Sequence, residues 1–132
     1  MRADLIAYLK TQSLGTVSVT EETPWTKDGE PLYLKNFKRI YIDREQIAQE
    51  PLFNTLDGSS LVNQTTTLIA YLVIDAKNPL VNYETIVSSM KAARNSVSPS
   101  SKLDRTVAVA KSYEGDALVT EFTFEFRQLI TT

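Results

Sequence analysis

Cysteine and histidine are both absent from this chain of 132 residues. Their absence excludes disulfide bonds, thiolate nucleophiles, Cys/His zinc sites and imidazole acid–base chemistry, including a Ser-His-Asp triad. Any catalysis would have to use carboxylate, Lys or Tyr side chains, and any metal would need oxygen ligands. Hydrophobic residues make up 42% of the chain, which predicts one globular domain spanning residues 1–132 with its own core.

The chain also has no large excess of charge of either sign and no long apolar run. The net charge is −2, from 14 basic and 16 acidic side chains, so no basic field is present to hold nucleic acid by its phosphates. The longest apolar run, residues 68–74, is far shorter than the ~20 residues that cross a bilayer. The N-terminal segment carries Asp4 and Lys10, unlike a signal peptide. We therefore expect an intracellular protein without a membrane segment.

Two segments have helical spacing of their apolar residues. Residues 3–14 place Leu5 and Leu9 on one face, and Gly15 follows as a candidate stop. Residues 83–97 carry a second apolar stripe, preceded by Asn82 as a candidate cap.

Five further segments have strand character, and together with the helices they predict an α+β fold. The segments are residues 16–22, 32–43, 64–75, 105–112 and 117–130. The last alternates cleanly, with Phe122, Phe124 and Phe126 on one face, which we expect to dominate the core. Residues 44–63 are predicted to be a long irregular loop. The expected architecture is a mainly antiparallel β-sheet with two α-helices packed on one face.

Acidic pairs are the main source of acid–base chemistry left to the chain. Glu121 and Glu125 share a face of the last strand, opposite the phenylalanines, and Asp43 and Glu45 lie together at a strand end. A solvated polar face and structural or interface roles explain them better than catalysis. The serines of the turn at residues 57–60 have no base placed beside them. The sequence predicts no catalytic, cofactor-binding or metal-binding residue, so we expect no enzyme.

A small basic cluster interleaved with aromatic residues is similar to a single-strand nucleic-acid surface. Its members are Lys35, Lys38 and Arg39, with Tyr33, Phe37 and Tyr41 between them. A solvated strand face with alternate aromatic residues in the core explains the pattern as well, and nearby acidic residues offset the charge. Weak, unspecific DNA binding is the expectation.

The strand at residues 64–75 is apolar on both faces, so both faces need cover. Two helices can cover one of them. The other needs either the 44–63 segment of the same chain or another protomer, and the residues do not choose between these. The candidates for an oligomer interface are Ile69, Tyr71, Val73, Phe53, Leu56 and Leu61.

The order of elements, with the strand Thr65–Ile74 (TTTLIAYLVI) and the closing strand Ala117–Phe126 (ALVTEFTFEF), resembles the tail-terminator proteins of long-tailed bacteriophages. The resemblance implies a homohexameric ring that caps the tail tube, ends tail elongation and presents a surface to the head connector. Its implied partners are further copies of itself, the tail tube protein and a head-connector or head-completion protein, with DNA only passing through the lumen. The implied location is the tail–neck junction of the virion, after synthesis in the host bacterial cytoplasm, and no cofactor is implied.

Three other functions stay open. Another phage neck or tail-completion protein would share most of these features. A small ligand-binding or enzyme domain could use Glu, Tyr or Lys, and a nucleic-acid module could use the basic cluster. Fold alone does not choose among them.

Overall fold

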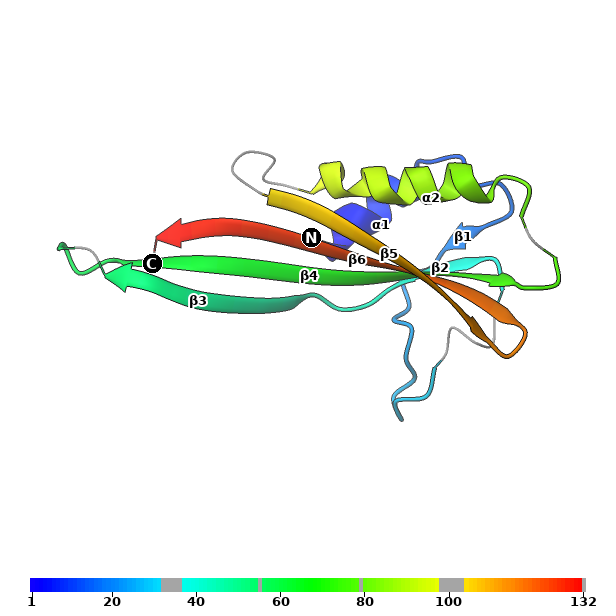
Figure 1. Ribbon diagram of the computed structural model, residues 1–132, viewed down its shortest axis with the longest axis horizontal. Helices are drawn as coiled ribbons and strands as arrows, with labels where there is room; N and C mark the ends of the chain where they lie inside the picture. Colours follow the sequence, from blue (N-terminus) through cyan, green and yellow to red (C-terminus); the bar gives the residue numbers. More distant parts are fainter. Residues whose placement is uncertain (32–36, 55, 79, 98–103, 132) are drawn as a thin grey trace.

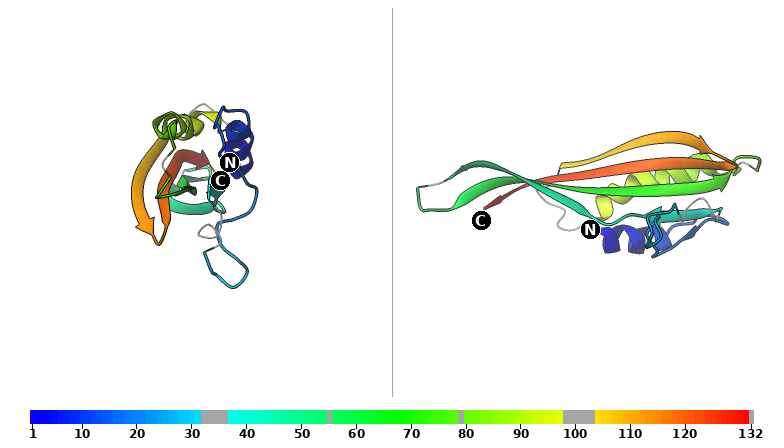
Figure 2. Two further views of the ribbon diagram at one scale, coloured as in Figure 1. Left: turned by 90° about the vertical axis from the view of Figure 1, so that its right-hand side faces the viewer. Right: turned by 90° about the horizontal axis from the view of Figure 1, so that it is seen from below.

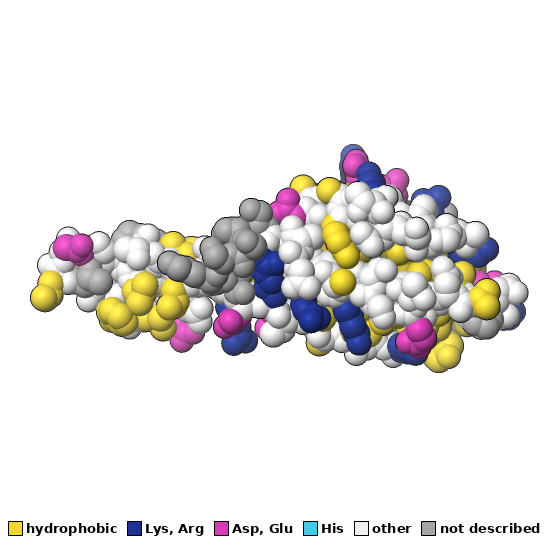
Figure 3. Space-filling view, turned by 90° about the horizontal axis from the view of Figure 1, so that it is seen from above, with side chains coloured by type: hydrophobic (Ala, Val, Ile, Leu, Met, Phe, Trp, Pro, Cys, Tyr) yellow, Lys and Arg dark blue, Asp and Glu magenta, His cyan; other side chains and the backbone are white. Residues whose placement is uncertain are grey.

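The computed structural model describes residues 1–31, 37–54, 56–78, 80–97 and 104–131. The described part of the chain has an elongated shape (Figure 1). A body built from the sheet and two helices lies at one end, and a narrow arm of strands extends from it. The space-filling view shows the same division, with the arm much thinner than the body (Figure 3).

One six-stranded sheet organises the described residues. Its strands are β1 (Ser18–Val19), β2 (Arg39–Ile42), β3 (Gln46–Asn54), β4 (Ser60–Asp75), β5 (Asp104–Glu114) and β6 (Ala117–Thr131). The order is β1-β2-β4-β6-β5, and β3 pairs with β4 beyond the end of β2. All pairs are antiparallel except β1 with β2. The long strand β4 is therefore central, with β6 along one side and β2 and then β3 along the other.

Both helices cover the same face of the sheet, which confirms the predicted α+β architecture (Figures 1 and 2). These are α1 (Arg2–Lys10) and α2 (Tyr83–Ala92), and α2 continues into a short 3₁₀ turn, η2 (Ala93–Ser96). The main core lies between this face and the helices. Its members include Leu5, Ile6, Leu9, Ile86, Met90, Phe122, Phe124 and Phe126, as the apolar spacing predicts.

The two helix ends differ from the sequence prediction. Helix α1 ends at Lys10, where the backbone N–H and the hydroxyl of Thr11 both donate to the carbonyl of Tyr8. Gly15 therefore lies beyond the helix, at φ +65°. Asn82 holds the N-cap position of α2, but its side chain makes no capping hydrogen bond. A Cβ on Gly15 would lie 2.8 Å from the Asn82 side-chain nitrogen, so the absence of a side chain there lets the two segments meet.

The opposite face of the sheet carries a second, smaller apolar cluster. It comprises Tyr41, Tyr71, Val73, Ala117 and Val119, with Ile69 packed against it. The segment at residues 20–31 lies on this side of the sheet (Figure 1), and its Trp25 ring meets the Tyr71 ring edge-on at 6.5 Å. Part of this face is therefore covered by the chain itself.

The prediction of an irregular loop at residues 44–63 is wrong. Most of this segment forms β3 and the start of β4, paired as an antiparallel hairpin from Gln46↔Thr67 to Asn54↔Ser60. The register shifts between Pro51 and Phe53, which places Leu52 in a bulge. The turn at residues 57–60 is correctly predicted, but it joins two strands of a hairpin.

Two predicted strands are shorter than expected. The 16–22 segment contains only the two-residue strand β1. Of the 32–43 segment, Arg39–Ile42 forms β2, while residues 32–36 lie outside the described residues. The predicted strands at 105–112 and 117–130 are confirmed with slightly wider bounds.

Candidate functional site

The arm consists of β3, residues 60–67 of β4 and residues 125–131 of β6, with the turn between β3 and β4 at its tip (Figure 1). Every residue of β3 is exposed. The arm also carries half of the large apolar side chains that are exposed in the described residues. These are Ile47, Leu52, Phe53, Leu56 and Leu129.

The strand register distributes these side chains over both faces of the arm. Phe53 pairs with Leu61, and Leu129 pairs with Asn63, two residues further along β4. Directly paired residues and residues two apart share a face, so Phe53, Leu61 and Leu129 form one apolar surface near the tip. Phe53 is 60% exposed and Leu129 is 62% exposed.

The other face of the arm has its own apolar row. Val62 pairs with Pro51 on one side and with Ile130 on the other. A row of glutamines lies next to it, in which the Gln49 amide nitrogen donates to the Gln64 side-chain oxygen at 2.9 Å. Both helices lie over the body, and no described element covers either face of the arm near its tip (Figures 1 and 2). Near its tip the arm is therefore a sheet without a second layer, whereas Phe126 at its base belongs to the main core.

The hairpin of the arm is also unusual in its charges. Residues 46–67 contain Glu50 and Asp57 and no Lys or Arg. An exposed edge strand is normally protected from pairing with other chains by charged side chains, especially lysine. Here the outer edge of β3 carries one charge, one proline and a bulge, and it pairs with no other strand among the described residues.

The structure divides the six predicted interface residues into two groups. Phe53 and Leu56 are exposed on the arm, and Leu61 lies half-buried between them and β6. Tyr71 is only 8% exposed and Val73 is fully buried, in the second cluster of the body. Ile69 is partly buried against the same cluster. Residues of the same chain bury Tyr71 and Val73, so these two side chains are not exposed to a second protomer.

Three exposed members of the arm, Ile47, Leu52 and Leu129, are not among the six predicted interface residues. Ile47 and Leu52 lie in the segment assigned to a loop, and Leu129 lies near the end of a strand that was treated only as core. The sequence does contain a signal for exposed apolar residues here, because β6 continues beyond Phe126 with apolar residues on both faces.

Asp43 and Glu45 do not form a joint acidic site. The Asp43 carboxylate accepts hydrogen bonds from the Trp25 indole N–H at 3.2 Å and from the backbone N–H of Arg44 at 2.7 Å. Glu45 accepts from the N-terminal ammonium of Met1 at 2.6 Å, and this bond is the main reason that its pKa is lowered. Each carboxylate thus has a separate structural partner.

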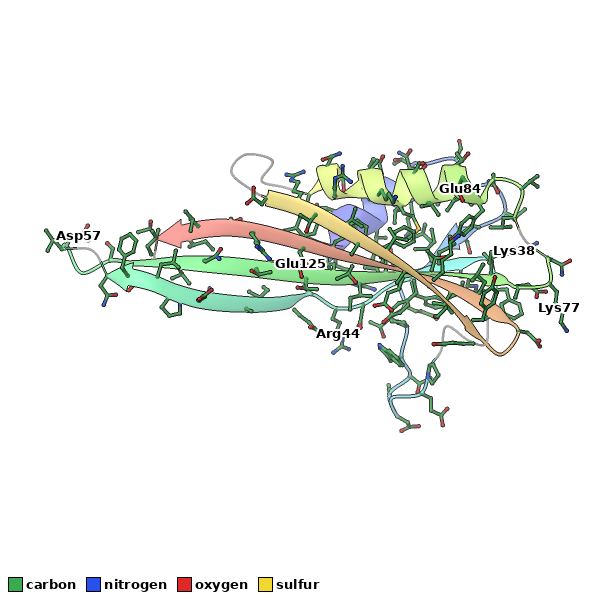
Figure 4. The ribbon with its side chains drawn as sticks, in the orientation of Figure 1. Lys38, Arg44, Asp57, Lys77, Glu84 and Glu125 are labelled. Atoms are coloured by element: carbon green, nitrogen blue, oxygen red, sulfur yellow. The ribbon has the colours of Figure 1, made fainter. Side chains whose placement is uncertain are left out.

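The other carboxylates follow the same pattern of local pairing. Glu125 receives a hydrogen bond from Arg127 at 3.4 Å on the surface of β6 (Figure 4 labels Glu125). The pKa of Glu21 is lowered by the Lys10 ammonium, and that of Asp75 by the backbone N–H of Lys77. In the described residues no group of three or more acidic side chains is arranged to hold a metal ion.

A cleft of about 370 Å³ beside Trp25 is the best candidate for a small-molecule site. It is lined by Thr23, Trp25, Thr26, Lys27, Asp43 and Arg44. The cleft offers one aromatic face and charges of both signs, and its carboxylate is already engaged by Trp25. This arrangement can bind a polar group.

The described members of the predicted basic and aromatic cluster do not all face solvent. Tyr41 is fully buried in the second cluster, so its ring cannot stack on a nucleotide base. Lys38 is exposed at a backbone turn with φ +59°, and Phe37 beside it is 38% exposed. Tyr33 and Lys35 lie outside the described residues.

No protein-family model matches the chain, and no curated protein is similar to it in sequence. Within the described residues, neither helix is long and apolar enough to cross a membrane.

Proposed function

We propose that this protein is a phage structural protein that forms a ring at the end of the tail tube. In this role it ends tail elongation and joins the tail to the head connector. The observation that carries the proposal is the arm, which is apolar on both faces and has no second layer near its tip. A monomer with such a surface is prone to aggregation unless another chain covers it.

The size of the arm suits a contact between protomers. Three strands about 4.8 Å apart, each about eight residues long at about 3.3 Å per residue, give two faces that together measure about 750 Å². A stable protein–protein interface buries about 800 Å² on each partner. Full coverage of the arm by a neighbouring protomer would therefore supply a contact of ordinary strength.

The position of the arm allows a ring as well as a reciprocal two-fold dimer, and the resemblance to tail terminators selects the ring. The arm extends from one end of the body (Figure 1), so it can meet a different surface of its neighbour. Such head-to-tail contacts generate rings when the rotation closes. The ring size of six comes from the resemblance to tail terminators and not from the residues.

A ring on the last layer of the tail tube would stop further subunits from adding and would give the head connector a surface to bind. DNA would pass through its lumen during ejection. A chain with net charge −2 and a hairpin arm without basic residues would not retain that DNA by its phosphates. The partners are then further copies of this chain, the tail tube protein and a head-connector or head-completion protein.

Two alternatives remain as proposals of lower rank. Another neck or tail-completion protein would use the same arm in the same way, with a different neighbour. A small ligand-binding domain is favoured by the cleft beside Trp25, which combines an aromatic ring with Lys27 and Arg44.

The test substitutes one aromatic residue on the arm and one on the body. Phe53→Asp places a charge on the apolar face of the arm, and Tyr113→Asp makes the same kind of change at a side chain that is 73% exposed on β5. We expect both variants to fold, with only Phe53→Asp losing ring formation in light scattering and the capping of tails in electron micrographs. Phage carrying Phe53→Asp should have tails of uncontrolled length. Normal assembly of Phe53→Asp, or loss of assembly with Tyr113→Asp alone, would contradict the proposal.

A further inference from the structure

A largely apolar groove lies beside α1. It measures about 470 Å³ and is lined by Arg2, Ala3, Ile6, Ala7, Lys10 and Glu21. The two alanines are exposed on the outer side of α1, and their small side chains leave room between the helix and the segment that follows β1. The floor is thus aliphatic, while the charged side chains stand at the rim.

Hydrogen bonds hold the rim of this groove in place. The Arg2 guanidinium donates to the carbonyls of Glu21 at 2.6 Å and Ile42 at 3.0 Å. The Lys10 ammonium forms an ion pair with the Glu21 carboxylate at 2.9 Å. The lining comes from two segments, α1 and Glu21, which these bonds tie together, so the groove is formed before anything binds in it. A preformed groove lowers the entropic cost of binding.

The tip of the arm matches this groove in apolar character and in charge. Leu56 is fully exposed at the tip, close to Phe53, and it presents an aliphatic side chain that fits an aliphatic floor. Asp57 stands beside it at the end of the molecule (Figure 4). The hairpin carries two acidic residues and no basic one, whereas the rim of the groove carries two cations and one anion.

The tip cannot reach the groove of its own chain. Helix α1 lies beside the body, and the tip lies at the far end of the long axis (Figure 2). We propose that the tip of the arm in one protomer, with Leu56 foremost, docks in the α1 groove of a second copy of this chain. The inference rests on the proposed self-association and goes beyond it, because it assigns the surface on which the arm binds.

This contact has the geometry that a ring requires. Each protomer offers one tip and one groove, and the two are different surfaces, so each copy can bind one neighbour on either side. Because the acidic tip meets a rim with an excess of positive charge, the contact also distinguishes the groove from the acidic 20–31 segment nearby.

The absence of cysteine makes the contact directly testable by disulfide trapping. A double variant Leu56→Cys/Ala7→Cys contains only the two introduced thiols. A disulfide forms without backbone movement only when the two Cα atoms lie within about 7 Å. If the tip docks in the groove, mild oxidation should give a ladder of covalent oligomers, ending at the ring size.

The matched control is Leu56→Cys/Val81→Cys, in which the second thiol replaces a fully exposed residue outside the groove. It should give no ladder beyond the background of Leu56→Cys alone. Equal ladders from both double variants would overturn the proposal. A ring observed by light scattering without cross-linking between positions 56 and 7 would overturn the docking site and leave the proposed function standing. If the double variant stayed a monomer without disulfides at every concentration, both the docking site and the proposed function would be overturned.

A second variant tests the groove without any cross-link. Ala7→Trp fills the groove at an exposed position of α1, and Ser88→Trp adds the same ring at an exposed position of α2. We expect Ala7→Trp to weaken self-association at least about tenfold, with an unchanged circular dichroism spectrum, and Ser88→Trp to have no effect. Equal association of the two variants would exclude the groove as the docking site.

Discussion

The Glu45 carboxylate, just before β3, is hydrogen-bonded to Met1 at the N-terminus of α1. Its Oε1 accepts hydrogen bonds from the Met1 ammonium at 2.6 Å and from the backbone N–H of Arg2 at 2.7 Å. Glu45 directly precedes β3, and Met1 and Arg2 begin α1. The carboxylate therefore fixes the first turn of the helix to the base of the arm, and its negative charge also lies favourably at the helix N-terminus.

We predict that Glu45→Gln lowers the free energy of unfolding at pH 7 by about 1 kcal/mol or less, since the partly exposed pair is screened by solvent. The two hydrogen bonds hold the pKa of Glu45 below its ordinary value of 4.5 in the folded protein. The ionised form thus stabilises the fold above that value, and this contribution is lost as the pH falls through the lower, folded-state pKa.

Urea denaturation of both proteins at several pH values would measure this difference. It should be constant from pH 6 to 7 and shrink below about pH 4.5 as the carboxylate becomes protonated. Glu22→Gln, at an exposed neighbouring acidic residue, serves as the control and should change stability little. A difference that grew with falling pH would contradict the assigned ion pair.

Most substitutions in a core lower the free energy of unfolding, but removing the Tyr41 hydroxyl should not. This hydroxyl is buried and has no hydrogen-bond partner in the part of the chain that the structure describes. A buried hydroxyl without a partner costs about 1–3 kcal/mol. Tyr41→Phe should therefore leave the free energy of unfolding unchanged or raise it by about 1 kcal/mol, as measured by thermal denaturation.

Tyr83 provides the matched comparison for Tyr41. Its hydroxyl shares a hydrogen bond of 2.7 Å with the hydroxyl of Thr120, which is itself buried. Tyr83→Phe leaves the Thr120 hydroxyl without that partner and should cost about 1 kcal/mol. If Tyr41→Phe were the more damaging of the two, the Tyr41 hydroxyl would have a partner in solution.

The phenylalanine face of β6 was predictable because one strong signal points to it. Strict alternation of Phe122, Phe124 and Phe126 with polar residues is typical of a half-buried strand, and burial of aromatic rings outweighs any local preference. The apolar stripe of α2 is a further clear signal, while that of α1 is weaker. From these signals the α+β architecture and the residues of the main core can be predicted.

The arm could not be predicted in the same way. A hydrophobic period arises only where one face of an element is buried and the other is exposed. β3 is exposed on both faces, so its apolar and polar residues follow no period. Pro51 and the bulge at Leu52 further interrupt the alternation, and both features favour a loop when the partner strand is unknown. The pairing with β4 depends on contacts that the local sequence does not encode.

The cover of Tyr71 and Val73 was missed for a related reason. The second cluster is completed by Tyr41 and Val119 and is approached by Trp25 from the 20–31 segment. That segment contains charged and turn-forming residues, which do not predict that it covers a sheet face. An apolar strand face can thus be buried by neighbouring strands and a single aromatic residue, without a third layer of helices.

Phe124 should be the most sensitive position of the main core. It is fully buried, with its ring stacked 6.5 Å from Phe122 and 6.4 Å from Phe126, measured between ring centroids. Phe124→Ala is expected to cost about 3–5 kcal/mol, because it removes the ring and leaves a cavity. Phe53→Ala on the arm should change the stability of the monomer by less than about 1 kcal/mol. Chemical denaturation of both variants would check this contrast, and similar losses would mean that the arm is packed in the monomer.

Lys38 occupies a backbone conformation that suits glycine better than lysine. Its φ is +59°, and its backbone is held on both sides, by a hydrogen bond from its N–H to the Val73 carbonyl at 2.7 Å and one from the Ser18 N–H to its own carbonyl at 3.1 Å. These two bonds connect β1 to β4 through the start of β2, so the conformation is fixed by the sheet. A left-handed conformation costs a residue with a Cβ about 1–2 kcal/mol.

Lys38→Gly should remove this strain and raise the free energy of unfolding by about 0.5–1 kcal/mol, after allowance for the greater backbone freedom of glycine in the unfolded chain. Lys38→Val should lower it by at least about 1 kcal/mol, since a β-branched side chain tolerates positive φ poorly. Lys38→Ala separates the backbone effect from the loss of the charge and should differ little from the wild type. Urea denaturation of the three variants gives the order Gly, Ala, Val from most to least stable, and a less stable glycine variant would show that φ at this position is negative in solution.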